Sequence, residues 1–372
     1  MDDWRAEVDE DAVRHQTTRT VEGRAGADPA LVRALAERLA AAENPVFVAG
    51  PDVDASGGWD AAVALAEKAR LPVWAAPATG GGRVGFPEDH PHFQGVLPPA
   101  VGPVSETLKG HDLILVAGSS VFAYYPNLPG PLLPEGAALV AITSDPDEAA
   151  RAPMGDAIVA DVRLTLEALL AAIDPSERPA PPPRAPLEEP EESDPMSPSA
   201  AIAALADVFP DGGIVVPESP ATTFAVRSRL RLSRPGSYYF TAGGGLGFAL
   251  PASLGVQLAQ PDRPVVSVLG EGSAQYAIQS FWTAVAYDIP VTFLVMRNQE
   301  YAILKWFGEI EQVTGAPGLD LPALDVAAVA EGYGVPSVRV SDRAALTEAL
   351  RDGIEAQGPR LVEARVAPGM AF

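Results

Sequence analysis

Residues 265–275 read VVSVLGEGSAQ and combine a strand-like apolar run, a glycine-rich turn and the start of a helix. The run is almost wholly apolar, which is typical of a parallel strand covered on both faces. Gly270 and Gly272 permit a tight turn, and the N–H groups at the start of a helix point toward an anion. In open α/β sheets, ligands bind beyond the carboxyl ends of the strands. The stretch therefore indicates an α/β fold with a ligand site at this turn.

The alternation of apolar runs and amphipathic stretches continues on both sides of this turn. In the C-terminal half, the predicted strands cover 213–219, 264–270, 290–296, 337–341 and 360–366, and the predicted helices cover 199–209, about 275–288 and 343–356. In the N-terminal half, strands are predicted at 45–50, 71–77, 112–118, 138–145 and 157–162, with helices at 29–43 and 58–69. This alternation predicts an α/β protein with two doubly wound parallel-sheet domains in series.

Two shifts in composition divide the chain. Residues 1–28 are polar and acidic and are expected to form an extended N-terminal lead-in. Residues 174–198 are rich in proline and glutamate, cannot form a packed core, and are expected to cross the surface as a linker. The predicted domains are therefore a Rossmann-like first domain at 29–173 and a second, ligand-binding domain at 199–372.

The overall composition restricts the classes of function. The 372 residues carry 49 acidic and 26 basic side chains, and the formal net charge of −23 disfavours binding to nucleic acid or to an anionic membrane. The chain has no cysteine, which excludes disulfides, thiolate catalysis and cysteine-ligated metals. Its acidic start is unlike a signal peptide, and no apolar run reaches the roughly 18 residues that a membrane span needs. We expect a soluble, cytoplasmic protein.

Glu271 lies inside the phosphate-type turn, where a carboxylate is expected only if a divalent cation accompanies it. The strand predicted at 290–296 is followed by Arg297 and Asn298, and parallel neighbours would place this second turn beside the first. Asn298 offers a side-chain oxygen, and a nearby main-chain carbonyl could complete the oxygen-rich shell that Mg²⁺ prefers. The two turns together predict a magnesium site.

A Gly-Glu-Gly triplet at 270–272 is separated by 24 residues, 273–296, from Arg297 and Asn298. This pattern resembles the fingerprint of the thiamine-diphosphate-dependent 2-oxo-acid decarboxylases. The flanking sequence in both halves of the chain is similar to the benzoylformate decarboxylases among them. The similar stretches are 50–55, 71–77, 86–95, 151–162, 236–259, 280–290, 300–307 and 317–325.

The resemblance implies the middle and diphosphate-binding domains of these enzymes, with thiamine diphosphate and Mg²⁺ as cofactors. It also implies a carboxy-lyase that decarboxylates a small-molecule 2-oxo acid without oxidation. Mg²⁺ would be held by Glu271, Asn298 and the carbonyl of Glu300. The thiamine diphosphate would be contacted by Gly244, Leu246, Gly270, Gly272, Ser273 and Tyr301, with Leu246 under the thiazolium ring. His90 would be the active-site histidine of the middle domain, and the substrate pocket would be lined by Phe240, Ile303, Leu304 and Phe307.

The sequence departs from the family pattern in four respects. Glu271 replaces the usual aspartate and is longer by one methylene, and Arg297 replaces the first of two asparagines. Pro220 and Ala221 replace hydroxyl residues. We also expect this sequence to lack the pyrimidine-binding domain, which carries the family's catalytic glutamate. We therefore expect little activity from this chain alone. Either a separate chain supplies that domain, or this chain is a fragment or a degenerate paralogue. We also expect a homo-oligomer.

Other interpretations stay open. A carboligase similar to acetolactate synthase would use the same cofactors, and a non-catalytic subunit of the same fold would bind them weakly or not at all. Glu271 could cap the following helix, His90 could be a solvated loop residue, and Phe240 or Phe307 could serve packing alone. The first domain lacks the G-x-G-x-x-G spacing, which argues against a bound nicotinamide or flavin.

Overall fold

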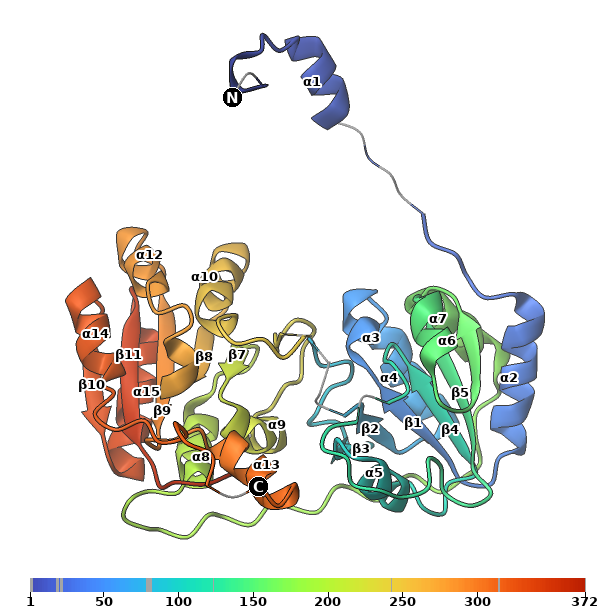
Figure 1. Cartoon of the computed structure of the whole chain (residues 1–372). Helices are drawn as coiled ribbons and strands as arrows, with labels where there is room; N and C mark the ends of the chain where they lie inside the picture. Colours follow the sequence, from blue (N-terminus) through green and yellow to red (C-terminus); the bar gives the residue numbers. More distant parts are fainter. Residues whose placement is uncertain are drawn as a thin grey trace.

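Two parallel sheets organise the protein, and helices cover each of them (Figure 1). The computed structural model describes residues 3–17, 20, 23–77, 82–122, 124–241, 243–313 and 315–371. None of the helices in these ranges is long and apolar enough to cross a membrane. The arrangement confirms the prediction of two parallel-sheet α/β domains in series.

Within the described residues, the first sheet has six strands in the order β3-β2-β1-β4-β5-β6. They are β1 (Pro45–Ala49), β2 (Val73–Ala75), β3 (Phe93–Val96), β4 (Leu113–Ala117), β5 (Ala138–Thr143) and β6 (Asp156–Val159). The helices are α2 (Pro29–Ala41), α3 (Pro51–Ala55), α4 (Trp59–Ala69), α5 (Val101–Thr107), α6 (Pro146–Arg151) and α7 (Val162–Ala172). The strand order reverses between β1 and β4, as it does in doubly wound folds.

The second sheet has five strands among the described residues, in the order β10-β11-β9-β8-β7. They are β7 (Ile214–Glu218), β8 (Val265–Gly270), β9 (Val291–Arg297), β10 (Ser337–Val340) and β11 (Arg360–Arg365). The helical elements are α8 (Pro198–Val208), the 3₁₀ turn η2 (Pro220–Thr222), α9 (Thr223–Arg229), α10 (Ala249–Ala259), α11 (Glu271–Ala274), α12 (Ser280–Ala286), α13 (Ala302–Ile310), α14 (Val326–Tyr333) and α15 (Arg343–Glu355).

Strand β8 is apolar because it contributes to two cores. Val266 and Val268 lie in a buried cluster with residues of α8 and α15. Val265 and Leu269 lie in a second buried cluster, with residues of α10 and α14. Successive side chains of a strand point to opposite faces, so both sets must be apolar. This packing fixes β8 between β7 and β9 and places Gly270 at the carboxyl edge of the sheet.

Some elements differ from the sequence-based expectations. A helix, α1 (Glu10–Thr17), lies in the lead-in that was expected to be extended, and the acidic side chains in its first turn suit a helix N-terminus. Strand β3 is short, with alternating buried and half-buried residues, so no continuous apolar run indicated it. Helix α10 contains Pro251, but in its first turn, where a missing N–H disrupts no intrahelical bond.

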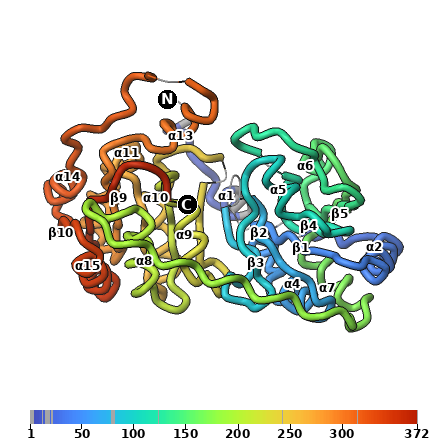
Figure 2. The backbone as a smooth tube through the Cα atoms, turned by 90° about the horizontal axis from the view of Figure 1, so that it is seen from below, coloured from blue at the N-terminus to red at the C-terminus, as the bar shows by residue number. Residues whose placement is uncertain are grey.

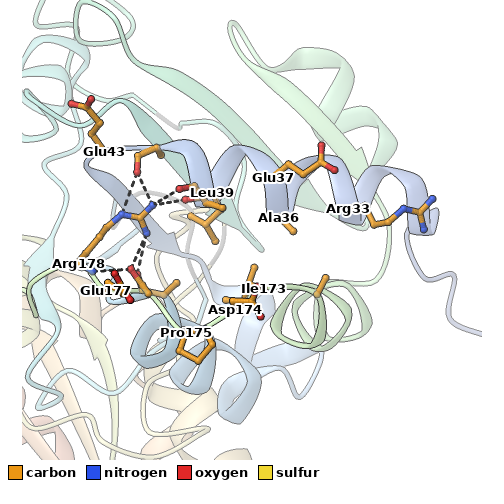
Figure 3. Close-up of a pocket in the computed structure, with 15 residues that line it drawn as sticks. Arg33, Ala36, Glu37, Leu39, Glu43, Ile173, Asp174, Pro175, Glu177 and Arg178 are labelled. Carbon is orange, nitrogen blue, oxygen red and sulfur yellow. Dashed lines mark hydrogen bonds between the residues drawn. The ribbon is translucent and has the colours of Figure 1, made fainter.

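The segment between α7 and α8 runs along one side of both domains (Figure 2). Near its start, Arg178 donates hydrogen bonds to the main-chain carbonyls of Leu39 (2.6 Å), Ala42 (2.6 Å) and Ala69 (3.4 Å), at the C-terminal ends of α2 and α4. Helix C-termini carry partial negative charge that favours a cation. A cavity of about 800 Å³ lies beside this contact (Figure 3). Because the guanidinium group donates its hydrogen bonds to these main-chain carbonyls, Arg178 anchors the linker to the first domain.

The two domains meet through buried polar contacts. Glu88 of the first domain pairs with Arg227 of α9, and their side chains are only 2% and 5% exposed. The guanidinium of Arg227 also lies over the ring of Tyr238, 4.9 Å from its centroid. Asp54 of α3 accepts a hydrogen bond from the main-chain N–H of Gly236 at 3.1 Å. These contacts position the first domain against the second.

Candidate functional site

A cavity of about 370 Å³ lies at the carboxyl ends of β7, β8 and β9. Gly270 of β8 is the ladder partner of Met296 of β9, so the two turns that the sequence singles out are neighbours. The structure brings twelve of the predicted site residues to the wall of this cavity: Gly244, Leu246, Gly270, Glu271, Gly272, Ser273, Asn298, Glu300, Tyr301, Ile303, Leu304 and Phe307.

Glu271 is 1% exposed and begins the one-turn helix α11. Its Oε1 accepts a hydrogen bond from the main-chain N–H of Gln299, so the carboxyl group links the turns after β8 and β9. Burial raises the pKa of Glu271 to about 7, although main-chain N–H groups and the charge of Arg297 act in the opposite direction. The site therefore contains a buried carboxyl group whose desolvation outweighs the opposing effects of the N–H groups and of Arg297.

The turn after β9 is held by its own polar groups. Gln299 has a φ of +60°, a left-handed conformation that is uncommon for a residue other than glycine. Oδ1 of Asn298 accepts a hydrogen bond from the main-chain N–H of Glu300 at 3.1 Å. The carbonyl of Gln299 accepts another from the N–H of Leu321 at 2.8 Å. These bonds hold Asn298 and Glu300 at the cavity wall.

Gly272 is required by the packing of Tyr301. A Cβ atom at position 272 would lie 2.5 Å from a ring carbon of Tyr301, which is closer than side chains can approach. Gly244 is different, since a Cβ there would meet no atom within 4 Å, but its φ of +67° favours glycine. One glycine therefore allows a close side-chain contact, and the other allows a backbone conformation.

Glu218 positions the loop that carries Gly244 and Leu246, and sequence reasoning missed this role. Its carboxylate accepts hydrogen bonds from the main-chain N–H groups of Gly247 (2.8 Å), Phe248 (2.7 Å) and Ala249 (2.7 Å) at the start of α10. The side chain is 2% exposed. The sequence did contain one indication of this role, because Glu218 ends an apolar strand. A carboxylate that is buried there needs hydrogen-bond donors or a cation as partners.

Helix α13 forms one side of the cavity and is tied down at its start. The side chain of Glu300 accepts hydrogen bonds from Nζ of Lys305 and from the main-chain N–H of Gly369, the latter at 2.8 Å. Lys305 also contacts Asp320 at 2.7 Å. The side chain of Glu300 therefore links α13 to the C-terminal segment, while Ile303, Leu304 and Phe307 line the cavity.

Two of the predicted site residues are not among those that line the cavity. Nε2 of His90 lies 3.3 Å from Oε1 of Glu67 on α4, and its ring packs edge-on against Phe86, 5.1 Å between centroids. These partners all belong to the first domain. Phe240 donates its main-chain N–H to the carbonyl of Gly82 at 3.0 Å and packs against a buried cluster. The structure therefore does not place His90 or Phe240 in the cavity wall.

The first domain reaches this region through Tyr125, which the sequence did not indicate. Its ring centroid lies 4.6 Å from that of Phe307, which lines the cavity, and Tyr125 is 58% exposed. The neighbouring Tyr124 is instead turned inward, and burial raises the pKa of its phenol to about 12. The sequence around Tyr124 and Tyr125 does not show which of the two reaches the site. The contact with Phe307 depends on how the two domains pack.

Comparison with known proteins identifies both domains. Residues 32–169 match the family described as thiamine pyrophosphate enzyme, central domain, and residues 221–364 match the C-terminal TPP binding domain of the same enzymes. The chain is 47% identical to benzoylformate decarboxylase of Pseudomonas aeruginosa over 97% of its own length and 68% of that protein. It is 31% identical to a putative acetolactate synthase large subunit of Mycobacterium tuberculosis, over 69% of the chain and 49% of that protein.

Solved structures give the same result. A 4-hydroxybenzoylformate decarboxylase of Rhodococcus jostii superposes with a TM-score of 0.90 at 44% identity, over 95% of this chain and 67% of that one. Benzoylformate decarboxylase of Polynucleobacter necessarius superposes with a TM-score of 0.91 at 36% identity, over 98% of this chain and 68% of that one. This sequence thus spans about two thirds of the length of these relatives. These matches confirm the predicted resemblance, and the chain belongs to the thiamine pyrophosphate enzymes, with the benzoylformate decarboxylases among its relatives.

Proposed function

We propose that this chain is the thiamine-diphosphate- and Mg²⁺-binding portion of a non-oxidative 2-oxo-acid decarboxylase that resembles benzoylformate decarboxylase. The observation that carries the proposal is the cavity at the ends of β8 and β9. Its wall contains the buried Glu271, together with Asn298, Glu300 and Leu246. The similarity of the whole chain to decarboxylases of this type supports the same reaction class.

The donor groups at this site suit Mg²⁺. The carboxylate of Glu271, the amide oxygen of Asn298 and the carbonyl of Glu300 are all hard oxygen ligands. The described residues contain no cluster of three or more His, Cys, Asp or Glu side chains able to hold a metal. Binding would therefore depend on diphosphate oxygens as well, which is how Mg²⁺ is commonly held in phosphate-binding sites. A cation here would also offset the desolvation that raises the pKa of Glu271.

The side chains of this chain would bind and orient the reactants. Thiamine diphosphate, when bound, supplies an electron-accepting thiazolium ring that stabilises the charge left as CO₂ departs. The main-chain N–H groups at Gly272 and Ser273 would face the diphosphate, and Leu246 would support the thiazolium ring. Ile303 and Phe307, with Tyr125 against Phe307, provide apolar surface that favours a 2-oxo acid with an aromatic or branched side chain.

A carboligase similar to acetolactate synthase is the second candidate, because such a protein is also among the relatives. It would use the same cofactors but join two substrates into an acyloin. Product analysis of the complete enzyme separates the two reactions, since a decarboxylase releases an aldehyde. A non-catalytic subunit of this fold would bind the cofactors weakly or not at all.

The reaction would also require a pyrimidine-binding domain, and this sequence spans only about two thirds of the length of its relatives. Self-association of this chain is also proposed. Several aromatic and aliphatic side chains are exposed on α10, α12 and the adjoining turns: Leu258 (67%), Tyr276 (60%), Trp282 (58%) and Tyr287 (68%). Such surfaces are typical of protein interfaces. Sedimentation should therefore show oligomers, and a strict monomer at micromolar concentrations would contradict this part of the proposal.

Calorimetric titration of thiamine diphosphate, with and without Mg²⁺, tests the binding function. The unaltered chain should bind the cofactor more tightly when Mg²⁺ is present, because Glu271 and the diphosphate would both supply oxygen ligands to the metal. Glu271→Ala should abolish this coupling, and Glu271→Asp should retain or strengthen it. Glu355→Ala, on the exposed side of α15, is the matched control and should behave like the unaltered chain.

Metal-independent binding that is equal in all four proteins would exclude Glu271 from metal coordination. On benzoylformate, the chain alone should show negligible decarboxylation. A rate of about 10 s⁻¹, which is typical of a complete enzyme, would contradict the need for a further domain.

A further inference from the structure

Two arginines face each other at the carboxyl edge of the second sheet. Arg297 ends β9, Arg365 ends β11, and the two are ladder partners in parallel strands. Neighbouring strands lie about 4.8 Å apart, so the two side chains project from the same face at close range. Like charges directly opposite each other destabilise a sheet unless an opposite charge compensates them.

The charge compensation of these arginines is incomplete. Arg297 forms an ion pair with Glu363 at 3.1 Å, and the second oxygen of Glu363 accepts a hydrogen bond from the main-chain N–H of Ala327. Nε of Arg297 is buried and has no hydrogen-bond partner among the described residues. Arg365 is exposed, and its guanidinium has no ion pair or hydrogen bond within the ranges that the structure describes. The buried carboxylate of Glu363 therefore compensates Arg297 alone, and Arg365 beside it has no counter-charge among the described residues.

A cavity of about 450 Å³ lies against the same two arginines. Its lining residues are Pro195, Arg297, Asn298, Gln299, Arg365, Val366 and Pro368. None of them is acidic, although the chain carries 49 acidic residues and a net charge of −23. The charged side chains in the wall are both cations, and two side-chain amides add further donors.

We propose that this cavity binds a small oxyanion, with a carboxylate or phosphate group held between Arg297 and Arg365. Guanidinium groups match both oxyanions because their paired N–H donors can bond two oxygens at once. The site is distinct from the candidate cofactor cavity, whose wall contains Glu271 and Leu246 but neither arginine. Asn298 and Val366 line both cavities, so the two sites are neighbours at the carboxyl edge of the sheet. The proposal does not depend on the function proposed above.

Calorimetric titration of the full chain with inorganic phosphate, and separately with benzoate, tests the proposal. Ionic strength is held constant with chloride, and Mg²⁺ is omitted. Arg365→Gln should weaken binding of the preferred anion about tenfold, as expected for the loss of a charge-assisted hydrogen bond. Arg231→Gln removes an exposed arginine elsewhere in the same domain and should leave the affinity unchanged.

Modification by phenylglyoxal, followed by peptide mass mapping, locates the bound anion. Arg365 should be modified in chloride and protected by the anion that binds, while Arg231 should be modified equally in both. Binding of phosphate alone identifies a phosphoryl ligand, and binding of benzoate alone identifies a carboxylate. The proposal is overturned if neither anion binds saturably at millimolar concentrations. It is also overturned if the measured affinity is unchanged in Arg365→Gln, since the anion would then lie elsewhere.

Discussion

Glu271 makes the stability of the protein depend on pH. Its pKa in the folded chain is about 7, above the ordinary value of 4.5, because burial disfavours the charged form. Between pH 4.5 and 7 the folded chain therefore holds a proton that the unfolded chain has released. The free energy of unfolding should fall as pH rises through this window, by up to about 3 kcal/mol.

Urea denaturation of the unaltered chain and of Glu271→Gln, from pH 4 to 8 without divalent cations, checks this prediction. The glutamine keeps an acceptor for the N–H of Gln299 but does not titrate. The two stabilities should be similar near pH 4, and the variant should become the more stable protein as pH rises. Parallel stability curves over the whole range would show that Glu271 does not titrate in this window.

At the scale of a single element, Glu218 holds the start of α10. Its carboxylate accepts three main-chain N–H groups that have no intrahelical partner, in a position that is 2% exposed. Glu218→Gln keeps the shape but replaces one acceptor oxygen with an N–H₂ group that faces those donors. We expect a loss of about 2–3 kcal/mol in the free energy of unfolding, measured by urea denaturation.

A matched control for this change is Asp342→Asn at the exposed start of α15. Asp342 accepts a hydrogen bond from the N–H of Ala345 at 2.9 Å, and asparagine caps helices about as well as aspartate does. The control should therefore change stability by much less than Glu218→Gln. Equal effects at both positions would mean that burial of the Glu218 carboxylate contributes nothing to α10.

At the scale of the whole molecule, the pair Glu88–Arg227 couples the two domains. Both side chains are buried, and desolvation raises the pKa of Glu88 despite the adjacent guanidinium. Glu88→Gln leaves Arg227 buried without its counter-charge. This substitution should lower the free energy of unfolding by about 3–5 kcal/mol. Calorimetry should show a lower unfolding temperature, or separate unfolding of the two domains.

The control for this pair is Arg339→Gln, which removes ion pairs with Asp325 and Glu331 in which all three side chains are 40–46% exposed. Exposed pairs contribute about 0–1 kcal/mol, so the unfolding temperature should barely change. A further variant, Glu88→Leu combined with Arg227→Met, should recover part of the loss because no buried charge remains unpaired. If Glu88→Gln proved as mild as the control, the contact would not couple the domains.

Local patterns in the sequence determined much of this protein. The apolar run of β8, the glycines after it and the acidic residue between them predict a strand, a turn and a ligand site. The 24 residues between this turn and Arg297-Asn298 suffice for a crossover to the next parallel strand, which is why Glu271 and Asn298 could be predicted to meet. A central strand that is buried on both faces needs apolar residues at successive positions, so a short stretch of sequence is enough to predict it.

The tertiary structure alone decided the remaining contacts. Glu218 reaches the start of α10, Tyr125 reaches Phe307 and Arg297 faces Arg365, and each contact joins segments far apart in the chain. His90 lies against Glu67 of its own domain, and not in the wall of the cavity. Such contacts depend on strand order, on register and on how two domains pack. The sequence does not predict these contacts, because the same polar or aromatic residue fits the neighbouring sequence equally well at the surface, in a loop or in a binding site.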